Sequence, residues 1–325
     1  MFNYIVRRLL QTIIVILGVT LLAFASLHMS GDPTALFVNE RASKEEIARV
    51  RHILGFDRPL PEQYLSYVGN MLRGDFGNSL KFKEPSLKLV MERLPATLEL
   101  TISAMLFSTL LAVPIGILAA TQRGTALDGG AMLLAITGQS MPSFWFGLML
   151  ILLFGVTLKW LPISGRVAII DPILAGDLSL AFQSLPNAIL KLILPTLTIG
   201  VYSLSRNARL VRSSMLEVLP QEYVTTARAK GLSEGVVIRR HALRNALIPI
   251  VTMFGLEFGF LLSGVVVTET IFSWPGVGRL VFNAIVQRDI PLVQTAVVVF
   301  SLMFVFVNLA VDILYAFLDP RIRLS

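Results

Sequence analysis

The chain has 325 residues, of which 54% are hydrophobic and only 15% are charged. A soluble domain carries about 25% charged residues, so this composition excludes an ordinary soluble domain and indicates a membrane protein. Cysteine is absent, which excludes disulfides and thiolate metal sites, and the three histidines lie in unrelated segments. The net charge of +7 is spread between apolar runs and is not gathered on a soluble domain, as nucleic-acid binding would require.

Residues 1–29 predict an N-terminal segment and a first membrane span. Arg7 and Arg8 precede an uncharged run over residues 9–29, which is about 31 Å long as a helix. The residues before Ser26 resemble a signal-peptide cleavage site, but the apolar run is longer than the roughly 7–15 residues of a signal sequence. We therefore expect this segment to span the membrane.

Residues 30–94 are polar and predict a small helical subdomain outside the membrane. A capping box at Ser43 and Glu46 begins a first short helix, a second begins near Pro61, and a third begins at Pro85. Each of the three carries apolar residues at helical spacing along one face.

Residues 95–318 predict a core of five further spans, the fourth of the chain beginning near Ile189. The third span holds a kinked, polar and aromatic string, where proline is tolerated if neighbouring groups take up the freed backbone. Five residues of this string are candidates for a pathway wall: Gln139, Met141, Pro142, Phe144 and Trp145. Helix packing around small residues explains the same string equally well.

Two carboxylates within the predicted spans are further pathway candidates, Glu257 and Glu269. Intramembrane carboxylates are costly and often functional. They could contact a substrate amine, or they could pair with arginines or polar neighbours between helices.

The stretch from Glu222 to Gly231 is a polar island in an apolar protein. Glu222 favours the start of a helix, and Lys230 followed by Gly231 favours its end. Tyr223 and Ala227 share one face, on which the small Ala227 would let another backbone approach closely. These residues predict a short helix that docks onto a partner.

Lysine and arginine in the short loops give the orientation, because they concentrate on the cytoplasmic side. Thirteen lie on the side of the N-terminus and five in the two shorter loops opposite. This predicts six spans with both termini inside, a cytoplasmic loop over residues 206–245 and a cytoplasmic tail over 319–325. Residues 271–291 predict an amphipathic helix in the outer interface.

The pattern Glu-x-x-x-x-Ala-x-x-x-Gly from Glu222 to Gly231, followed by Ile248 and Pro249, resembles the EAA cytoplasmic loop of ABC-importer permeases. Tyr223 and Val224 replace the Ala-Ala of that loop's name, as is usual in the dipeptide, oligopeptide and nickel branch. Four other segments resemble that branch: Leu54–Pro59, Arg73–Ser79, Gly138–Gly147 and Glu269–Gly276.

The resemblance implies an all-α polytopic protein of the bacterial cytoplasmic membrane with the type I importer permease fold, the periplasmic subdomain following its first helix. It implies a second related permease, two ATP-binding subunits and a periplasmic substrate-binding protein as partners, with lipids around them and no nucleic acid. ATP and Mg would be bound by the partners, because this chain has no phosphate-binding G-x-x-x-x-G-K-[ST] loop. It would be non-catalytic and bind no cofactor or metal itself.

The function implied is that of a permease subunit forming half of a pathway for dipeptides and oligopeptides. The residues implied to couple it to the ATPase are Glu222, Tyr223, Thr226, Ala227, Lys230, Gly231 and Leu232. The same scaffold could import glutathione or nickel, and an ion-coupled secondary transporter is the alternative from another class. The arginines that follow the fourth span could meet lipid phosphates, the partner ATPase or Glu217; they are Arg206, Arg209 and Arg212.

Overall fold

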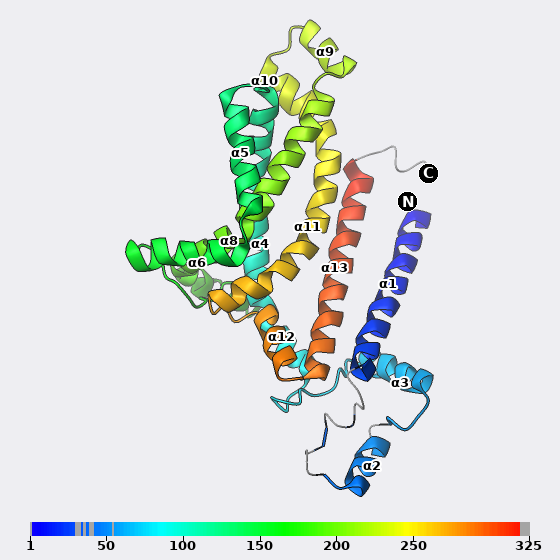
Figure 1. Ribbon diagram of the computed structural model, residues 1–325. Coiled ribbons are helices and arrows are strands. Elements are labelled where there is room, and N and C mark those ends of the chain that lie inside the picture. The colour runs from blue at the N-terminus through cyan, green and yellow to red at the C-terminus, as the bar shows by residue number, and fades with distance from the viewer. Residues whose placement is uncertain (1, 30–33, 35–36, 39–41, 54, 319–325) are drawn as a thin grey trace. The chain divides into compact units, whose positions relative to one another are not determined.

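The computed structural model describes residues 2–29, 34, 37–38, 42–53 and 55–318, with side chains for all of these except 2–10, 26–27, 29, 247–256, 263–264 and 311–318. Every regular element in this part of the chain is a helix, apart from an isolated bridge between Asn78 and Pro85 (Figure 1). The expected all-α class is confirmed. The predicted tail over residues 319–325 lies outside the described residues.

Three of the described helices are long and apolar enough to cross a membrane. They are α4 (Ser86–Thr121), α8 (Leu178–Val218) and the segment Ile290–Ala310 of α13 (Ile290–Leu318). A fourth candidate is α5 (Ala126–Ser140) together with Ser143–Thr157, which are bent by 102° relative to each other. Large apolar side chains on these helices, such as Leu134 and Phe306, are exposed, which suits contact with lipid. The prediction of six spans also includes α1 (Phe2–Met29) and α11 (Leu243–Ile271), and it stays a prediction.

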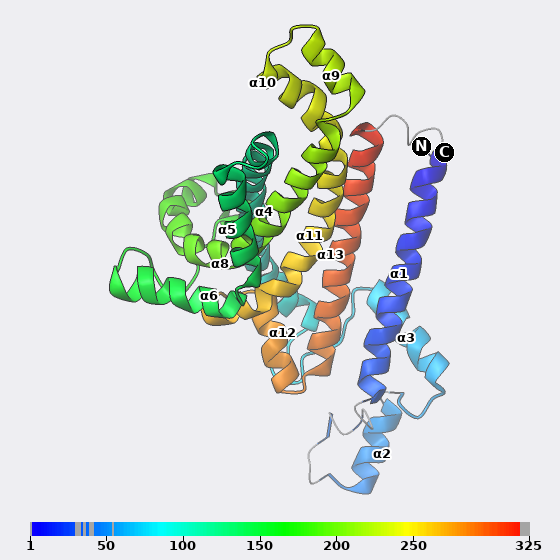
Figure 2. The same cartoon turned by 45° about the horizontal axis from the view of Figure 1, so that its top comes forward.

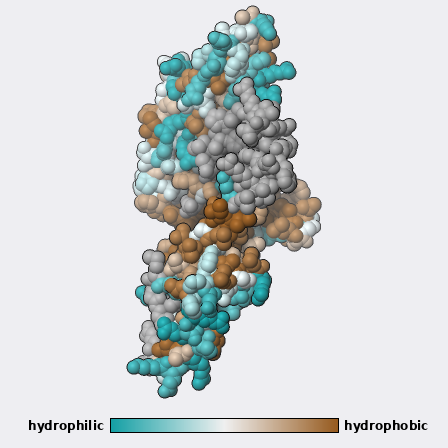
Figure 3. Space-filling model, turned by 90° about the vertical axis from the view of Figure 1, so that its right-hand side faces the viewer, coloured by the Kyte–Doolittle hydropathy of each residue, from teal (hydrophilic) through white to brown (hydrophobic). Residues whose placement is uncertain are grey.

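The chain forms two compact units, and unit 1 comprises residues 1–94 and 279–306. Here α3 (Leu60–Leu72) packs against α1, where the hydroxyls of Tyr64 and Thr20 lie 3.0 Å apart. The predicted cap is present at α2 (Lys44–Ile53), because the hydroxyl of Ser43 accepts a hydrogen bond of 3.2 Å from the N–H of Glu46. Hydrophilic side chains cover α2 on the face shown in Figure 3.

Asp289 anchors the loop of unit 1 that precedes α4. It lies between α12 (Val277–Val286) and α13, and its carboxylate is buried. It accepts hydrogen bonds from the hydroxyl of Ser79 and from the N–H groups of Leu80, at 3.1 Å, and Lys81, at 3.2 Å. The Arg73–Ser79 segment recognised in the sequence therefore ends where the chain is hydrogen-bonded to the buried carboxylate of Asp289.

Unit 2 comprises residues 95–278 and 307–325 and is built around α8. Helices α5, α6 (Ser143–Leu150), α7 (Ile170–Leu174) and α11 all contact α8, and both cartoon views show α5 beside it (Figures 1 and 2). Small residues permit the close crossings with α4: a Cβ placed on Gly116 would lie 2.6 Å from Val211, and one on Gly200 would lie 2.6 Å from Phe107. Glycine is required at such contacts because any side chain would overlap the facing helix.

Two element boundaries differ from those predicted. Helix α4 runs without a break through Pro95, so the third short helix and the second span are one helix. Helix α8 begins at Leu178, well before the predicted start at Ile189, because Asp177 caps it by accepting a hydrogen bond of 3.0 Å from the N–H of Leu180. Both predictions treated proline as a boundary, whereas membrane helices can accommodate it internally.

A buried ion pair in unit 2 holds the loop between η2 (Ile151–Thr157) and α8. The carboxylate of Glu99 on α4 accepts hydrogen bonds from Nε and Nη2 of Arg166, both at 2.7 Å. It also accepts from the N–H groups of Ile169, at 2.8 Å, and Ile170, at 2.7 Å, where α7 begins. Pairing with an arginine was one of the two roles that the sequence allowed for carboxylates within the spans, and Glu99 takes this role.

Replacing Glu99 with Gln removes the buried charge partner of Arg166 and leaves its guanidinium paired only with Asp171, whose side chain is more exposed. We expect Glu99→Gln to lower the free energy of unfolding by about 3–5 kcal/mol, the usual cost of breaking a buried pair. The exposed pair of Glu84 and Lys88, at 2.9 Å, provides the control, and Glu84→Gln should cost at most about 1 kcal/mol. Thermal unfolding in detergent measures both, and equal effects would contradict the anchoring role.

Candidate functional site

The predicted docking helix exists as α9 (Glu222–Ala229). Glu222 lies in its first turn, and Lys230 closes its last turn by donating its N–H to the carbonyl of Thr226 at 3.0 Å. Gly231 then has φ +76°, a conformation that only glycine adopts without strain. The end signals at Glu222 and Gly231 therefore predicted the extent of this helix correctly.

One face of α9 is buried within unit 2. Val224 and Ala227 pack in an apolar cluster with residues of α8, η3 (Val237–Ala242) and α11. The other members of this cluster are Ala120, Val211, Met215, Val237, Ala242 and Ala246. The expectation that Ala227 supplies a close contact to a partner was therefore wrong, because its side chain is only 4% exposed and makes that contact inside the chain.

The opposite face of α9 and the turn after it are exposed. Six of the seven predicted coupling residues are on this surface: Glu222, Tyr223, Thr226, Lys230, Gly231 and Leu232. We call these six residues the α9 surface. Figure 1 shows α9 and α10 (Glu234–Val236) projecting beyond the ends of α8 and α11.

Two exposed polar contacts that the sequence analysis missed connect parts of this loop. Arg228 and Glu234 form a two-bonded pair, with Nε to Oε2 at 3.1 Å and Nη2 to Oε1 at 2.7 Å, and this hydrogen bonding lowers the pKa of Glu234. The side-chain amide of Asn245 donates to the Tyr223 hydroxyl at 2.8 Å, which joins α9 to α11. Arg228 and Glu234 are six residues apart, which is not a spacing that brings side chains together on one helix. They meet because the chain turns at Gly231 between them.

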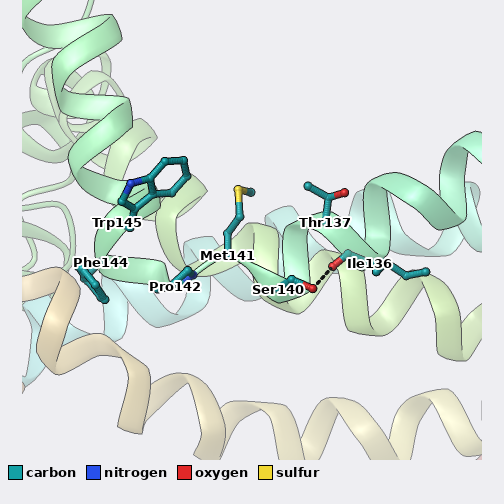
Figure 4. A pocket seen from close by; sticks show the side chains of 7 residues that line it. All are labelled: Ile136, Thr137, Ser140, Met141, Pro142, Phe144 and Trp145. Atoms are coloured by element: carbon teal, nitrogen blue, oxygen red, sulfur yellow. Dashed lines mark hydrogen bonds between the residues drawn. The ribbon is translucent and has the colours of Figure 1, made fainter.

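The five candidate pathway residues of the third span lie at the break between α5 and α6. A cavity of about 550 Å³ is lined there by Ile136, Thr137, Ser140, Met141, Pro142, Phe144 and Trp145 (Figure 4). Thr137, Met141 and Trp145 point to the same side of the bend in this view. Gln139 is absent from the lining, and its Oε1 is buried without a hydrogen-bond partner. The structure thus brings four of the five candidates together.

Glu257 and Glu269 do not line this cavity but lie in separate buried networks. Glu257 accepts a hydrogen bond from the amide of Asn207, which also donates to Ser108 at 3.0 Å. Glu257 therefore uses one carboxylate oxygen on a polar neighbour between helices, while its other oxygen, Oε1, is buried without a hydrogen-bond partner.

The network around Glu269 holds the chain where α11 ends and α12 begins. Its Oε1 accepts from the Thr97 hydroxyl at 2.7 Å, and Thr97 accepts from the N–H of Val277 at 2.8 Å. Gly276 lies directly over the carboxylate, where a Cβ would overlap it. Trp274, fully buried, donates Nε1–H to the carbonyl of Ala96 at 2.8 Å. The Glu269–Gly276 motif therefore fixes the turn between α11 and α12 against α4.

The three arginines of α8 differ in their partners. Arg212 forms a two-bonded ion pair with Asp128 of α5, at 2.6 and 2.8 Å, which was not among the predicted partners. The guanidinium carbon of Arg206 lies 5.5 Å from the centre of the Phe260 ring. Nε of Arg206 and Nε of Arg209 are both buried without a hydrogen-bond partner. Among the described residues, no group of three or more His, Asp or Glu side chains could hold a metal ion.

Comparison with known proteins identifies the family of the chain. The family model described as "Binding-protein-dependent transport system inner membrane component" matches residues 112–324, and the model of the N-terminal part of such components matches residues 1–101. The chain belongs to this family of transport components. It is a permease subunit of an ABC importer, and a multi-pass protein of the bacterial inner membrane.

Relatives of this permease match over its whole length. It is 45% identical to the Di/tripeptide transport system permease protein DppB of Pseudomonas aeruginosa and 44% identical to the Dipeptide transport system permease protein DppB of Escherichia coli K12, over 99% of each chain. It is 42% identical to the Glutathione transport system permease protein GsiC of Salmonella choleraesuis, also over 99% of each chain. The inward-facing MetNI methionine ABC transporter shares the fold, with a TM-score of 0.55 and 16% identity over 71% of this chain and 96% of that one.

The two alanines of α9 test how the loop of this permease is held. Ala227→Glu would place a carboxylate in the apolar cluster, and we expect it to release the loop, since burial of an unpaired charge is strongly unfavourable. Ala229→Glu makes the same change at an exposed position of the same helix and should leave the loop in place. Limited proteolysis of the detergent-solubilised permease measures the difference. Equal cleavage between residues 219 and 236 in the two variants would contradict the burial of this face.

Proposed function

We propose that the permease forms half of the transmembrane pathway of an ATP-driven importer of dipeptides and short oligopeptides. The full-length identities of 45% and 44% to di/tripeptide and dipeptide permeases support this substrate class. Glutathione, itself a short peptide, is the second candidate, supported by the identity of 42% to a glutathione permease. Nickel import and ion-coupled secondary transport have no comparable support.

In the proposed arrangement, six spans place both termini in the cytoplasm and the subdomain over residues 30–94 in the periplasm. The distribution of lysine and arginine supports this orientation, which puts the loop over residues 206–245 on the side of ATP. A second related permease completes the pathway, and a periplasmic binding protein delivers the substrate. Two separate subunits bind ATP and Mg, while this chain is non-catalytic and binds no cofactor.

The observation that carries the coupling mechanism is the division of α9 into two faces. The buried face, Val224 and Ala227, is part of the core formed by α8 and α11. The α9 surface is free for an ATPase subunit. A push on that surface reaches both helices through packed side chains, and packed interiors transmit displacement because they contain few voids. ATP-driven closure of the partners then tilts α8 and α11 and opens the pathway alternately to each side.

The cavity at the α5–α6 break is the proposed wall of the pathway within this subunit. Phe144 and Trp145, each about half exposed, offer apolar surface, and Thr137 and Ser140 offer hydroxyl groups. Such mixed lining suits peptides, whose side chains vary while their backbone amides do not. Glu257 and Glu269 have their own partners and support the helices that surround this wall.

Leu232, which is 40% exposed on the α9 surface, gives a direct test of coupling. We expect Leu232→Asp to reduce transport-coupled ATP hydrolysis at least about tenfold, because apolar anchors dominate the energetics of protein interfaces. Leu174→Asp is the control, since Leu174 is 75% exposed at the end of α7, outside the α9 surface.

The assay uses the complete importer in proteoliposomes and measures ATP hydrolysis stimulated by loaded binding protein, with dialanine as substrate. Undiminished coupling in Leu232→Asp would refute the docking role of the α9 surface. Failure of the unmodified importer to take up dialanine would refute the substrate class.

A further inference from the structure

Three side chains of unit 2 form a stacked cluster on facing surfaces of α8 and α11. The rings of Tyr202 and Phe260 are stacked, with centroids 5.2 Å apart and planes inclined by 18°. The guanidinium carbon of Arg206 lies 5.5 Å from the centre of the Phe260 ring. Phe260 is 43% exposed, so the cluster has an open side.

The charge of Arg206 is not neutralised by the described part of the chain. No carboxylate lies within ion-pair distance, and Nε has no hydrogen-bond partner although it is buried. Arg209, one turn further along the helix, also has a buried Nε without a partner. Arg212, the next in the series, is fully paired with Asp128. A buried N–H without a partner is costly, so Arg206 offers an unused donor to an anion that the described chain does not supply.

Arg206 lies deeper in the helix bundle than Arg212. The partner of Arg212, Asp128, lies in the first turn of α5, next to the turn that follows α4. Arg206 is six residues further into α8 and therefore about 9 Å deeper. The adjacent Asn207 belongs to the buried network of Glu257 and Ser108.

We infer that Arg206, with Phe260 and Tyr202, forms a relay site that binds the terminal carboxylate of a peptide as it passes through the permease. A planar guanidinium can donate two parallel hydrogen bonds to a carboxylate. The half-exposed ring of Phe260 provides apolar contact beside the charge, which suits the side chain next to that carboxylate. Arg209 offers a second cation one turn nearer the cytoplasmic end. This inference rests on the proposed function, since it requires a substrate that carries a carboxylate.

The absence of cysteine from the chain permits a single-thiol experiment at this site. We expect Arg206→Cys to reduce uptake of dialanine by the complete importer about tenfold or more, the loss expected for a hydrogen bond to a charged group. Aminoethyl methanethiosulfonate would restore a positive charge and with it most of the uptake. Propyl methanethiosulfonate, of similar length but neutral, would not. Excess dialanine during ATP turnover should slow modification of this thiol, as measured by mass spectrometry of the chain.

Arg123→Cys provides the matched control, because Arg123 is exposed in the turn between α4 and α5. Its uptake should equal that of the unmodified importer, and dialanine should not protect its thiol. Normal uptake by Arg206→Cys, or rescue by the neutral reagent, would overturn the relay site. Rescue by the cation without protection by dialanine would also overturn it, and would assign the charge to a lipid phosphate or a neighbouring subunit. An unmodified importer that ignores dialanine would instead refute the proposed substrate class.

Discussion

The burial of Val224 and Ala227 makes α9 part of the helix bundle. The two side chains pack with Val211 and Met215 of α8 and with Ala246 of α11, so α9 cannot move independently of these helices without exposing apolar surface to water. The pair of Arg228 and Glu234 and the bond from Asn245 to Tyr223 add polar restraints on the outer side. In the proposed coupling mechanism, a loop held in this way would pass a displacement on to α8 and α11.

Charged groups in the helical core follow a pattern that bears on function. The buried carboxylates are each used: Glu99 by Arg166 and two backbone N–H groups, Asp128 by Arg212, and Glu257 by Asn207. These acids therefore hold helices and loops together, although Oε1 of Glu257 is buried without a hydrogen-bond partner. Among the described cationic groups, Arg206 and Arg209 keep a buried N–H without a hydrogen-bond partner. In a low-dielectric interior such donors favour an anion, which suits the carboxylate of a peptide.

The sequence predicted best where local chemistry decides the structure. Gly231, the acidic Glu222 and the cap at Ser43 act within a few residues, and the elements they bound were found. The sequence did not predict which way Ala227 faces. Its small side chain suits a close contact either with a partner or with the permease's own core. Pairings across long separations, such as Asp128 with Arg212, depend on how the spans pack and leave no periodic signal. The boundary at Pro95 was wrong because rules for soluble helices treat proline as a helix boundary.

Helix α8 carries both the apolar cluster under α9 and the aromatic stack at Arg206. This helix of 41 residues begins at the cap of Asp177, and both of its internal prolines, Pro186 and Pro195, lie in its first half. From Arg206 to Val218, the end nearest α9, the helix has no proline and no break, so its hydrogen-bonded turns move together. The apolar cluster under α9 and the aromatic stack at Arg206 thus lie on one stiff segment. A displacement imposed at α9 must shift Arg206 relative to its surroundings, which would weaken the hold on a bound anion in the same step that moves the bundle.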